Sequence, residues 1–228
     1  MFDGKFRRPV DRAVEPVGNA LRRTGLTPDH LTVVGLIVGV AAAVAIGTGR
    51  LFLGLLLVVL AGLPDLLDGA LAKASGAASE RGAFFDSTVD RITDAVLMGG
   101  IAWHFAATES PFLVLLPFAV SAVAQIISYQ RAKAESLGLD AKGGLMERAE
   151  RIVLLCLGLA VPVLLVPVLW VMLGLSSITA VQRFVKVWRQ AEVAPITQER
   201  IDLRRTRRHH RRMVRSQRRR TLVPRRRT

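Results

Sequence analysis

Long apolar runs separated by short polar segments occupy most of the sequence between residues 31 and 187. A helix needs about 20 mainly apolar residues to cross the hydrocarbon core of a membrane, and most of these runs approach that length. Pro162 and Pro167 mark a tight turn between the last two runs, which predicts a helical hairpin there. The pattern predicts an all-α, polytopic membrane protein with six transmembrane helices, at about 31–47, 51–72, 82–107, 111–134, 152–165 and 166–187.

A different pattern precedes the first run. In residues 2–25, apolar side chains recur at helical spacing among lysines and arginines, which is typical of an amphipathic helix lying on the membrane surface. Thr27, Pro28 and Asp29 then form a helix-start signal, with a capping residue followed by proline in the first turn.

Composition changes the picture mainly at the carboxyl end. The chain has 228 residues, of which 51% are apolar, and its formal net charge of +14 is matched by about the same number of arginines after Glu199. We therefore expect a membrane domain at 1–198 and an Arg-rich, disordered tail at 199–228. Such a tail would attach to the anionic leaflet, at about 1 kcal/mol per basic residue. Specific nucleic-acid binding is not expected, because no aromatic platform accompanies the arginines.

The distribution of basic residues predicts the orientation. Six spans place both termini on one side, and the loops on that side are rich in lysine and arginine, whereas the opposite loops hold Arg50 and little else. Since basic loops stay in the cytosol, we expect a multi-pass plasma-membrane protein with cytosolic termini. The only cysteine, Cys156, lies in an apolar run, so neither a disulfide framework nor a thiolate metal site is expected.

Four aspartates lie at the ends of apolar runs on this cytosolic side. Asp65 and Asp68 are three residues apart and Asp86 and Asp90 are four apart, so each pair shares a helix face. A carboxylate in hydrocarbon costs about 2.5–3.5 kcal/mol, so four of them need compensating charge. The alternative is that they cap helices or form salt bridges at the membrane surface. Oxygen ligands suit Mg²⁺ or Mn²⁺, which makes divalent cations the natural partners.

These aspartates fall in a long motif. The stretch from Asp65 to Asp90 resembles the signature of the CDP-alcohol phosphotransferases, D-x-x-D-G-x-x-A-R-x8-G-x3-D-x3-D, with Lys73 in place of the family's arginine. The resemblance implies that the four aspartates bind two Mg²⁺ or Mn²⁺ ions, that Asp90 is the general base, and that the protein is a homodimer. It also implies CDP-diacylglycerol contacts at Asp29, His30, Leu31, Thr32, Gly69, Lys73, Ser79 and Gly82.

A basic cluster follows on later helix ends of the same side. These residues either bind a second phosphate or are the flanking charges that most membrane proteins carry. The segments around Ser128 and Glu147 resemble those of the actinobacterial phosphatidylinositol phosphate synthases, except that Arg131 and Lys133 stand in reversed order and Ala149 replaces proline. This resemblance implies transfer of a phosphatidyl group to inositol 1-phosphate with release of CMP. The acceptor phosphate would be bound by Ser128, Arg131, Lys133, Arg148, Arg151 and Arg183.

Other functions stay open at this point. A phosphatidylglycerophosphate synthase, which uses glycerol 3-phosphate, would need a similar basic pocket. A cation transporter could also use intramembrane carboxylates, although these gather at the ends of two spans. An Arg-tailed membrane anchor without enzymatic activity would leave the four aspartates unexplained.

Overall fold

The computed structural model describes residues 27–75, 79–108 and 111–191; for 64–75 and 111 it describes the backbone only. All regular elements in these ranges are helical. The predicted surface helix at 2–25 and the tail at 199–228 lie outside the described residues. The elements are α2 (Pro28–Gly47), α3 (Leu51–Ser75), α4 (Glu80–Thr108), η1 (Pro111–Val114), α5 (Leu115–Ser136), α6 (Arg148–Ala160), η2 (Pro162–Leu164) and α7 (Leu165–Ala191).

The apolar pattern predicted the number and order of these helices, but several boundaries differ by a few residues, and those of α6 differ most. The helix expected at 152–165 begins four residues earlier and ends at Ala160, after which Val161 is extended (φ −127°, ψ 92°). Pro162 causes this end, because proline lacks an amide proton for the helical hydrogen bond and disfavours a helical residue before it. The turn expected at this proline is therefore confirmed.

The start of α2 is fixed by the predicted capping signal. The Thr27 hydroxyl accepts a hydrogen bond from the His30 amide, and the Thr27 amide donates to His30 Nδ1, with Pro28 in the first turn. This reciprocal capping box satisfies two amides that a helix start otherwise leaves unpaired.

Small residues bring α2 close to α4. Gly39, Ala43 and Gly47 are spaced four apart on α2, and a Cβ added at Gly39 or Gly47 would collide with Thr93 or Trp103 of α4. In return, a Cβ at Gly100 of α4 would lie 2.5 Å from the Ala43 carbonyl oxygen. Small residues at this spacing allow two backbones to approach closely, as in many membrane helix pairs.

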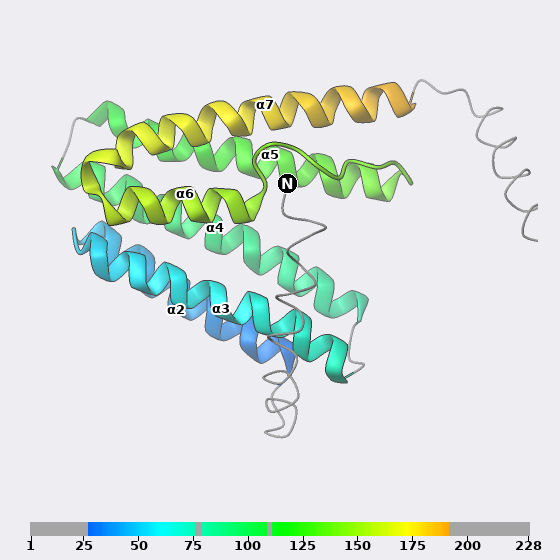
Figure 1. Ribbon diagram of the computed structural model, residues 1–228, viewed down its shortest axis with the longest axis horizontal. Helices are drawn as coiled ribbons and strands as arrows, with labels where there is room; N and C mark the ends of the chain where they lie inside the picture. The colour runs from blue at the N-terminus through cyan, green and yellow to red at the C-terminus, as the bar shows by residue number, and fades with distance from the viewer. Residues whose placement is uncertain (1–26, 76–78, 109–110, 192–228) are drawn as a thin grey trace, which may run out of the picture. The chain divides into compact units, whose positions relative to one another are not determined.

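The chain divides into two compact units after Phe184, and the helix contacts and cleft described for this protein lie in the first unit. Within it, α2 packs on both α3 and α4, α4 packs on α5, and α3 also contacts α6 (Figure 1). The core draws on all six α-helices, with fully buried Ile46, Ile101, Leu159, Leu169 and Met172 among its members.

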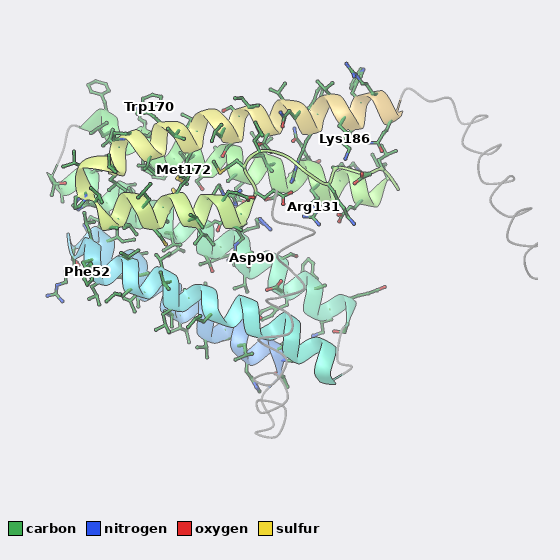
Figure 2. All side chains as sticks on the ribbon, viewed as in Figure 1. Phe52, Asp90, Arg131, Trp170, Met172 and Lys186 are labelled. Carbon is green, nitrogen blue, oxygen red and sulfur yellow. The ribbon has the colours of Figure 1, made fainter. Side chains whose placement is uncertain are left out.

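The outward surface of these helices is apolar. Phe52, Phe118, Trp103 and Trp170 are each more than half exposed, and Figure 2 shows Phe52 and Trp170 away from the core residue Met172. An apolar surface of this extent is expected where lipid replaces water. Within the described residues, three helical segments are long and apolar enough to cross a membrane: Pro28–Gly47, Phe112–Ser136 and Pro162–Ala191.

The close approach of α2 and α4 makes a test of the fold. We expect Gly100→Ala to destabilise the protein by about 1–3 kcal/mol, because the methyl group would press on the Ala43 backbone, which cannot move aside alone. The matched control is Gly99→Ala, where the new Cβ meets nothing within 4 Å. Thermal denaturation in detergent should show a lower midpoint for Gly100→Ala only; equal midpoints would contradict the packing described.

Candidate active site

A cleft of about 1160 Å³ opens beside the first turns of α4 and contains Asp86, Asp90 and most of the predicted acceptor-binding residues, but none of the predicted nucleotide contacts that the structure describes. Its walls come from α4, the later half of α5, the start of α6, and Arg183 of α7. The charged residues that line it are Asp86, Asp90, Arg91, Arg131, Glu135, Glu147, Arg148, Arg151 and Arg183.

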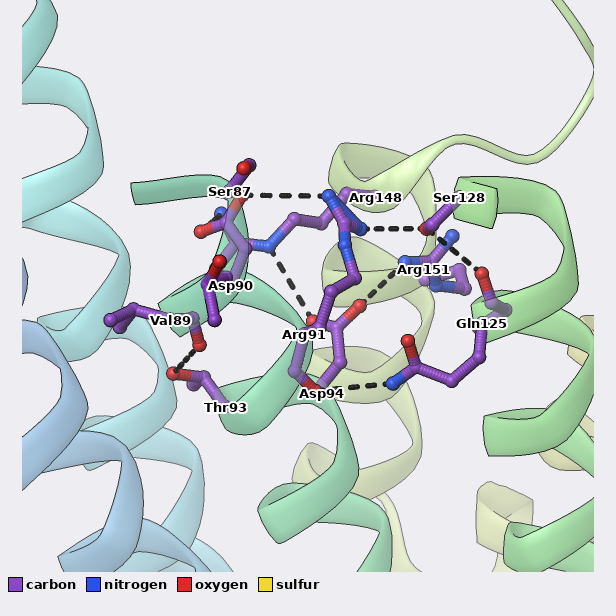
Figure 3. Close-up of polar contacts among 12 residues, drawn as sticks. Ser87, Val89, Asp90, Arg91, Thr93, Asp94, Gln125, Ser128, Arg148 and Arg151 are labelled. Atoms are coloured by element: carbon purple, nitrogen blue, oxygen red, sulfur yellow. Dashed lines mark hydrogen bonds and ion pairs between the residues drawn. The ribbon is translucent and has the colours of Figure 1, made fainter. Parts of the chain in front are cut away.

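Two carboxylates form the acidic wall. Asp86 and Asp90 are one turn apart on α4, and both are partly buried at the cleft. One carboxylate oxygen of Asp90 lies 2.7 Å from a terminal nitrogen of Arg148, and the Asp90 side chain is 16% exposed. Figure 3 shows Arg148 reaching from α6 toward α4. The predicted base therefore contacts a predicted phosphate ligand directly.

The start of α6 presents its arginines to the cleft. Glu147 caps this helix in a capping box with Glu150, so that Arg148 is the first helical residue. Arg148 and Arg151 are three residues apart and therefore share a helix face. Both line the cleft, although the Arg151 side chain is only 7% exposed.

Two residues of α4 that had no predicted role in the site connect it to its neighbours. Asp94 accepts from Arg148 Nε at 3.4 Å and from a terminal nitrogen of Arg151 at 2.6 Å. Arg91 donates to the Ser128 hydroxyl at 2.8 Å, while its carbonyl accepts from Gln125. The spacing of four from Asp90 to Asp94 was the available signal, since it places both carboxylates on one helix face.

Arg183 holds the loop between α5 and α6. Its guanidinium donates to the carbonyls of Gly143 (3.0 Å) and Ile127 (3.1 Å) and pairs with Glu147 at 2.8 Å, and the residue is 4% exposed. One turn earlier, the buried Thr179 hydroxyl accepts from the Met146 amide. These contacts from α7 fix the path of the chain just before the arginines of α6.

The predicted nucleotide contacts whose side chains are described gather at the starts of α2 and α4. Ser79 caps α4 by accepting from the Gly82 amide at 3.0 Å, and a Cβ at Gly82 would lie 3.7 Å from a carboxylate oxygen of Asp29. His30 serves in the capping box of α2, and the Thr32 hydroxyl donates to the Pro28 carbonyl. The structure thus brings Asp29, Ser79 and Gly82 together. Leu31 lies on the same turn of α2 as Asp29 and is partly buried.

Other predicted residues are placed differently or not described. Lys133 is exposed on α5 and is not among the residues lining the cleft. Asp65, Asp68, Gly69 and Lys73 lie on the last turns of α3, whose side chains are outside the described part.

The described residues fit a divalent cation only in part. Asp86 and Asp90 supply carboxylate oxygens, the ligand type that Mg²⁺ and Mn²⁺ prefer. Within the described part of the chain, no group of three or more His, Cys, Asp and Glu side chains could hold a metal ion. A complete site therefore needs ligands from residues whose side chains are not described, which is where the motif puts Asp65 and Asp68.

The sequence model of the CDP-alcohol phosphatidyltransferase family matches residues 25–188. This chain belongs to that family.

Similar proteins from several actinobacteria are named phosphatidylinositol phosphate synthases. This chain is 36% identical over 192 residues to the phosphatidylinositol phosphate synthase of Mycobacterium marinum, covering 80% of this chain and 82% of the relative. It is 38% identical over 188 residues to the synthase of Corynebacterium glutamicum, covering 78% and 85%. A crystal structure of the Mycobacterium tuberculosis phosphatidylinositol phosphate synthase (PgsA1) with CDP-DAG bound gives a TM-score of 0.72 at 36% identity, covering 78% of this chain and 94% of that one. The same enzyme in complex with manganese and citrate gives 0.73, covering 77% and 88%.

The contacts of Arg183 make a stability prediction. We expect Arg183→Lys to lose two of the three hydrogen bonds, about 1 kcal/mol each, and to lower the thermal midpoint by about 4–8 °C. The control is Arg131→Lys, which is exposed and has one surface ion pair to Glu135 at 3.1 Å, worth at most about 1 kcal/mol. Midpoints would be measured in detergent; an unchanged value for Arg183→Lys would mean that the loop does not depend on this clamp.

Proposed function

We propose that this enzyme transfers the phosphatidyl group of CDP-diacylglycerol to inositol 1-phosphate, forming phosphatidylinositol phosphate and releasing CMP. One observation carries the proposal: a single cleft has carboxylates of α4 on one wall and arginines of three other helices around them. Membership of the family supports phosphatidyl transfer, and the names of the relatives support the acceptor.

The size and charge of the cleft suit a phosphorylated alcohol beside the carboxylates of α4. Pockets for one small ligand usually measure about 300–1,000 Å³, and this cleft measures about 1160 Å³. Arginine is the preferred residue for phosphate, because its planar group donates two parallel hydrogen bonds. Arg131, Arg148, Arg151 and Arg183 all line the cleft, so a phosphorylated alcohol has its binding groups there.

The contact between Arg148 and Asp90 explains how the acceptor would meet the base. A phosphate that binds Arg148 lies next to Asp90, since these two side chains are already within 2.7 Å. A hydroxyl group of the acceptor is thereby held near the Asp90 carboxylate, which takes its proton as the oxygen attacks the lipid-side phosphorus. A new phosphorus–oxygen bond forms, the bond to the nucleotide phosphate breaks, and CMP leaves.

The divalent cation belongs to this proposal. Mg²⁺ or Mn²⁺, held by Asp65, Asp68, Asp86 and Asp90, would neutralise the diphosphate and the charge that develops on CMP. The crystal structure of the M. tuberculosis enzyme with manganese supports this choice of metal. Asp29, His30, Leu31, Thr32, Gly69, Lys73, Ser79 and Gly82 would hold the nucleotide.

The enzyme is a membrane protein, and its finer arrangement is part of the proposal. We infer six spans, because α3, α4 and α6 pack in the same bundle as the three apolar spans. Charged residues in α4 and the short length of α6 distinguish these helices from the three spans. Arg131, Lys133, Lys142 and Arg148 lie at the cleft end and Arg50 at the opposite end, which favours a cytosolic cleft. A surface helix at 2–25, a domain boundary near residue 198, a membrane-attached tail and a homodimer stay predictions.

We expect Asp90→Asn to reduce transfer at least about 100-fold, because the amide cannot accept the hydroxyl proton. The substitution keeps the size of the side chain and one oxygen for Arg148. The control is Ser87→Ala on the same wall, whose hydroxyl donates to the Phe84 carbonyl, and we expect activity within about twofold of the wild type. CMP release by purified protein measures both; a few per cent of activity in Asp90→Asn would remove Asp90 from the role of base.

The acceptor is tested directly by supplying CDP-diacylglycerol and Mg²⁺ or Mn²⁺ with either inositol 1-phosphate or glycerol 3-phosphate. We expect CMP release with inositol 1-phosphate and little with glycerol 3-phosphate. The reverse result would make the enzyme a phosphatidylglycerophosphate synthase, with the same base and metal residues but a different alcohol in the basic pocket. CMP release with neither alcohol, from folded protein, would reject both acceptors.

A further inference from the structure

We propose that Asp94 is a positioning residue for the acceptor: it holds Arg148 and Arg151 so that both guanidinium groups face one phosphate. This inference rests on the proposed function, because it assigns the two arginines to an acceptor phosphate. It adds a residue outside the metal-binding motif and outside the basic cluster.

The carboxylate of Asp94 contacts two arginines at once. Its Oδ2 lies 2.6 Å from a terminal nitrogen of Arg151, and its Oδ1 lies 3.4 Å from Nε of Arg148 (Figure 3). Each carboxylate oxygen thus takes one arginine. The first of these distances is in the range of a short, charge-assisted hydrogen bond.

Asp94 lies behind the cleft. Arg148 and Arg151 line the large cleft, whereas Asp94 does not. Instead it borders a separate cavity of about 20 Å³ whose other walls include Leu97, Met98 and Leu155. A side chain in this place can act on an acceptor only through the arginines that it contacts.

The charges of the two arginines explain why they need a carboxylate between them. Two guanidinium groups on one face of α6 repel each other, and the Arg151 side chain is only 7% exposed, so its charge would be costly without a carboxylate. A guanidinium has five N–H donors, and Asp94 accepts from one donor of each arginine. Most of the donors are therefore not used by Asp94. It orients Arg151 directly, and it orients Arg148 together with Asp90, which lies 2.7 Å from another nitrogen of that guanidinium.

The simpler explanation is that Asp94 only pins α6 to α4. Under that explanation, losing the carboxylate lowers the amount of folded protein but leaves the KM of the folded fraction unchanged. Under the positioning proposal, the KM for the acceptor rises while the KM for CDP-diacylglycerol does not. The two explanations therefore differ in a kinetic quantity that stability alone does not move.

The experiment compares full-length Asp94→Asn with Thr93→Val, each normalised to folded protein. Asparagine keeps the size of the side chain but replaces one accepting oxygen with an amide that cannot accept from arginine. Thr93 is the buried neighbour on α4; its hydroxyl donates to the Val89 carbonyl, and it packs on Gly39 of α2, away from the arginines. Thr93→Val therefore controls for a buried polar loss at this level of α4.

We expect Asp94→Asn to raise the KM for inositol 1-phosphate at least about tenfold, with the KM for CDP-diacylglycerol within about twofold, and Asp94→Glu to recover part of the loss. Thr93→Val should leave both KM values within about twofold. A KM for the acceptor that is unchanged or lowered in Asp94→Asn would overturn the positioning role.

A binding measurement separates this inference from the proposed function. Calorimetric titration of inositol 1-phosphate into the wild type and Asp94→Asn, without CDP-diacylglycerol, should show at least about tenfold weaker binding in the variant. If the wild type turns over glycerol 3-phosphate instead, the proposed acceptor is wrong, and the same comparison with glycerol 3-phosphate decides the role of Asp94. Equal affinities in wild type and variant would reject the role whichever alcohol is used.

Discussion

Pairing between carboxylates of α4 and arginines of α6 is the interaction on which the site depends. Ionised groups within an apolar helix bundle are costly unless each has a partner of opposite charge. Asp90 and Asp94, one turn apart on α4, meet Arg148 and Arg151, three residues apart on α6. The same pairs that make these charges tolerable also bring the proposed base beside the proposed phosphate ligands, so stability and chemistry share one set of contacts.

Two other features keep this pairing in register. Glycine and alanine allow α2 to lie close to α4, which fixes the helix that carries both carboxylates. On the opposite side, Arg183 and Thr179 of α7 hold the loop that leads into α6. The acidic and basic walls of the cleft are therefore each supported by a different neighbouring helix.

Sequence patterns predicted much of the architecture and part of the site. The positions of the helices follow from the long apolar runs, the start of α2 from Thr27 and Pro28, and the turn after α6 from Pro162 and Pro167, all of which are local signals, although the predicted end of α6 at 165 was too late. The motif pointed to Asp86 and Asp90, and the basic cluster to Arg148. Asp94 had no predicted role, because its partners are 54 and 57 residues away in the sequence and no local signal identifies them. Likewise, the three partners of Arg183 could not be predicted from the sequence, because they lie on α5 and on the loop between α5 and α6, whereas Arg183 lies on α7.

The loop between α5 and α6 has a practical consequence for protein engineering. Its Gly138, Gly143 and Gly144 have positive φ angles, and a glycine-rich connection of this kind would ordinarily be chosen to receive a fusion partner. Here Gly144 lies directly against Thr179, and Ala141 and Met146 are fully buried, so an insertion would separate this loop from α7. The turn at η2 is the better position, since Val163 is 85% exposed there and the turn is closed by its own Leu164–Val161 hydrogen bond. A rigid partner placed at η2 would enlarge the particle for electron microscopy while leaving the cleft as it is.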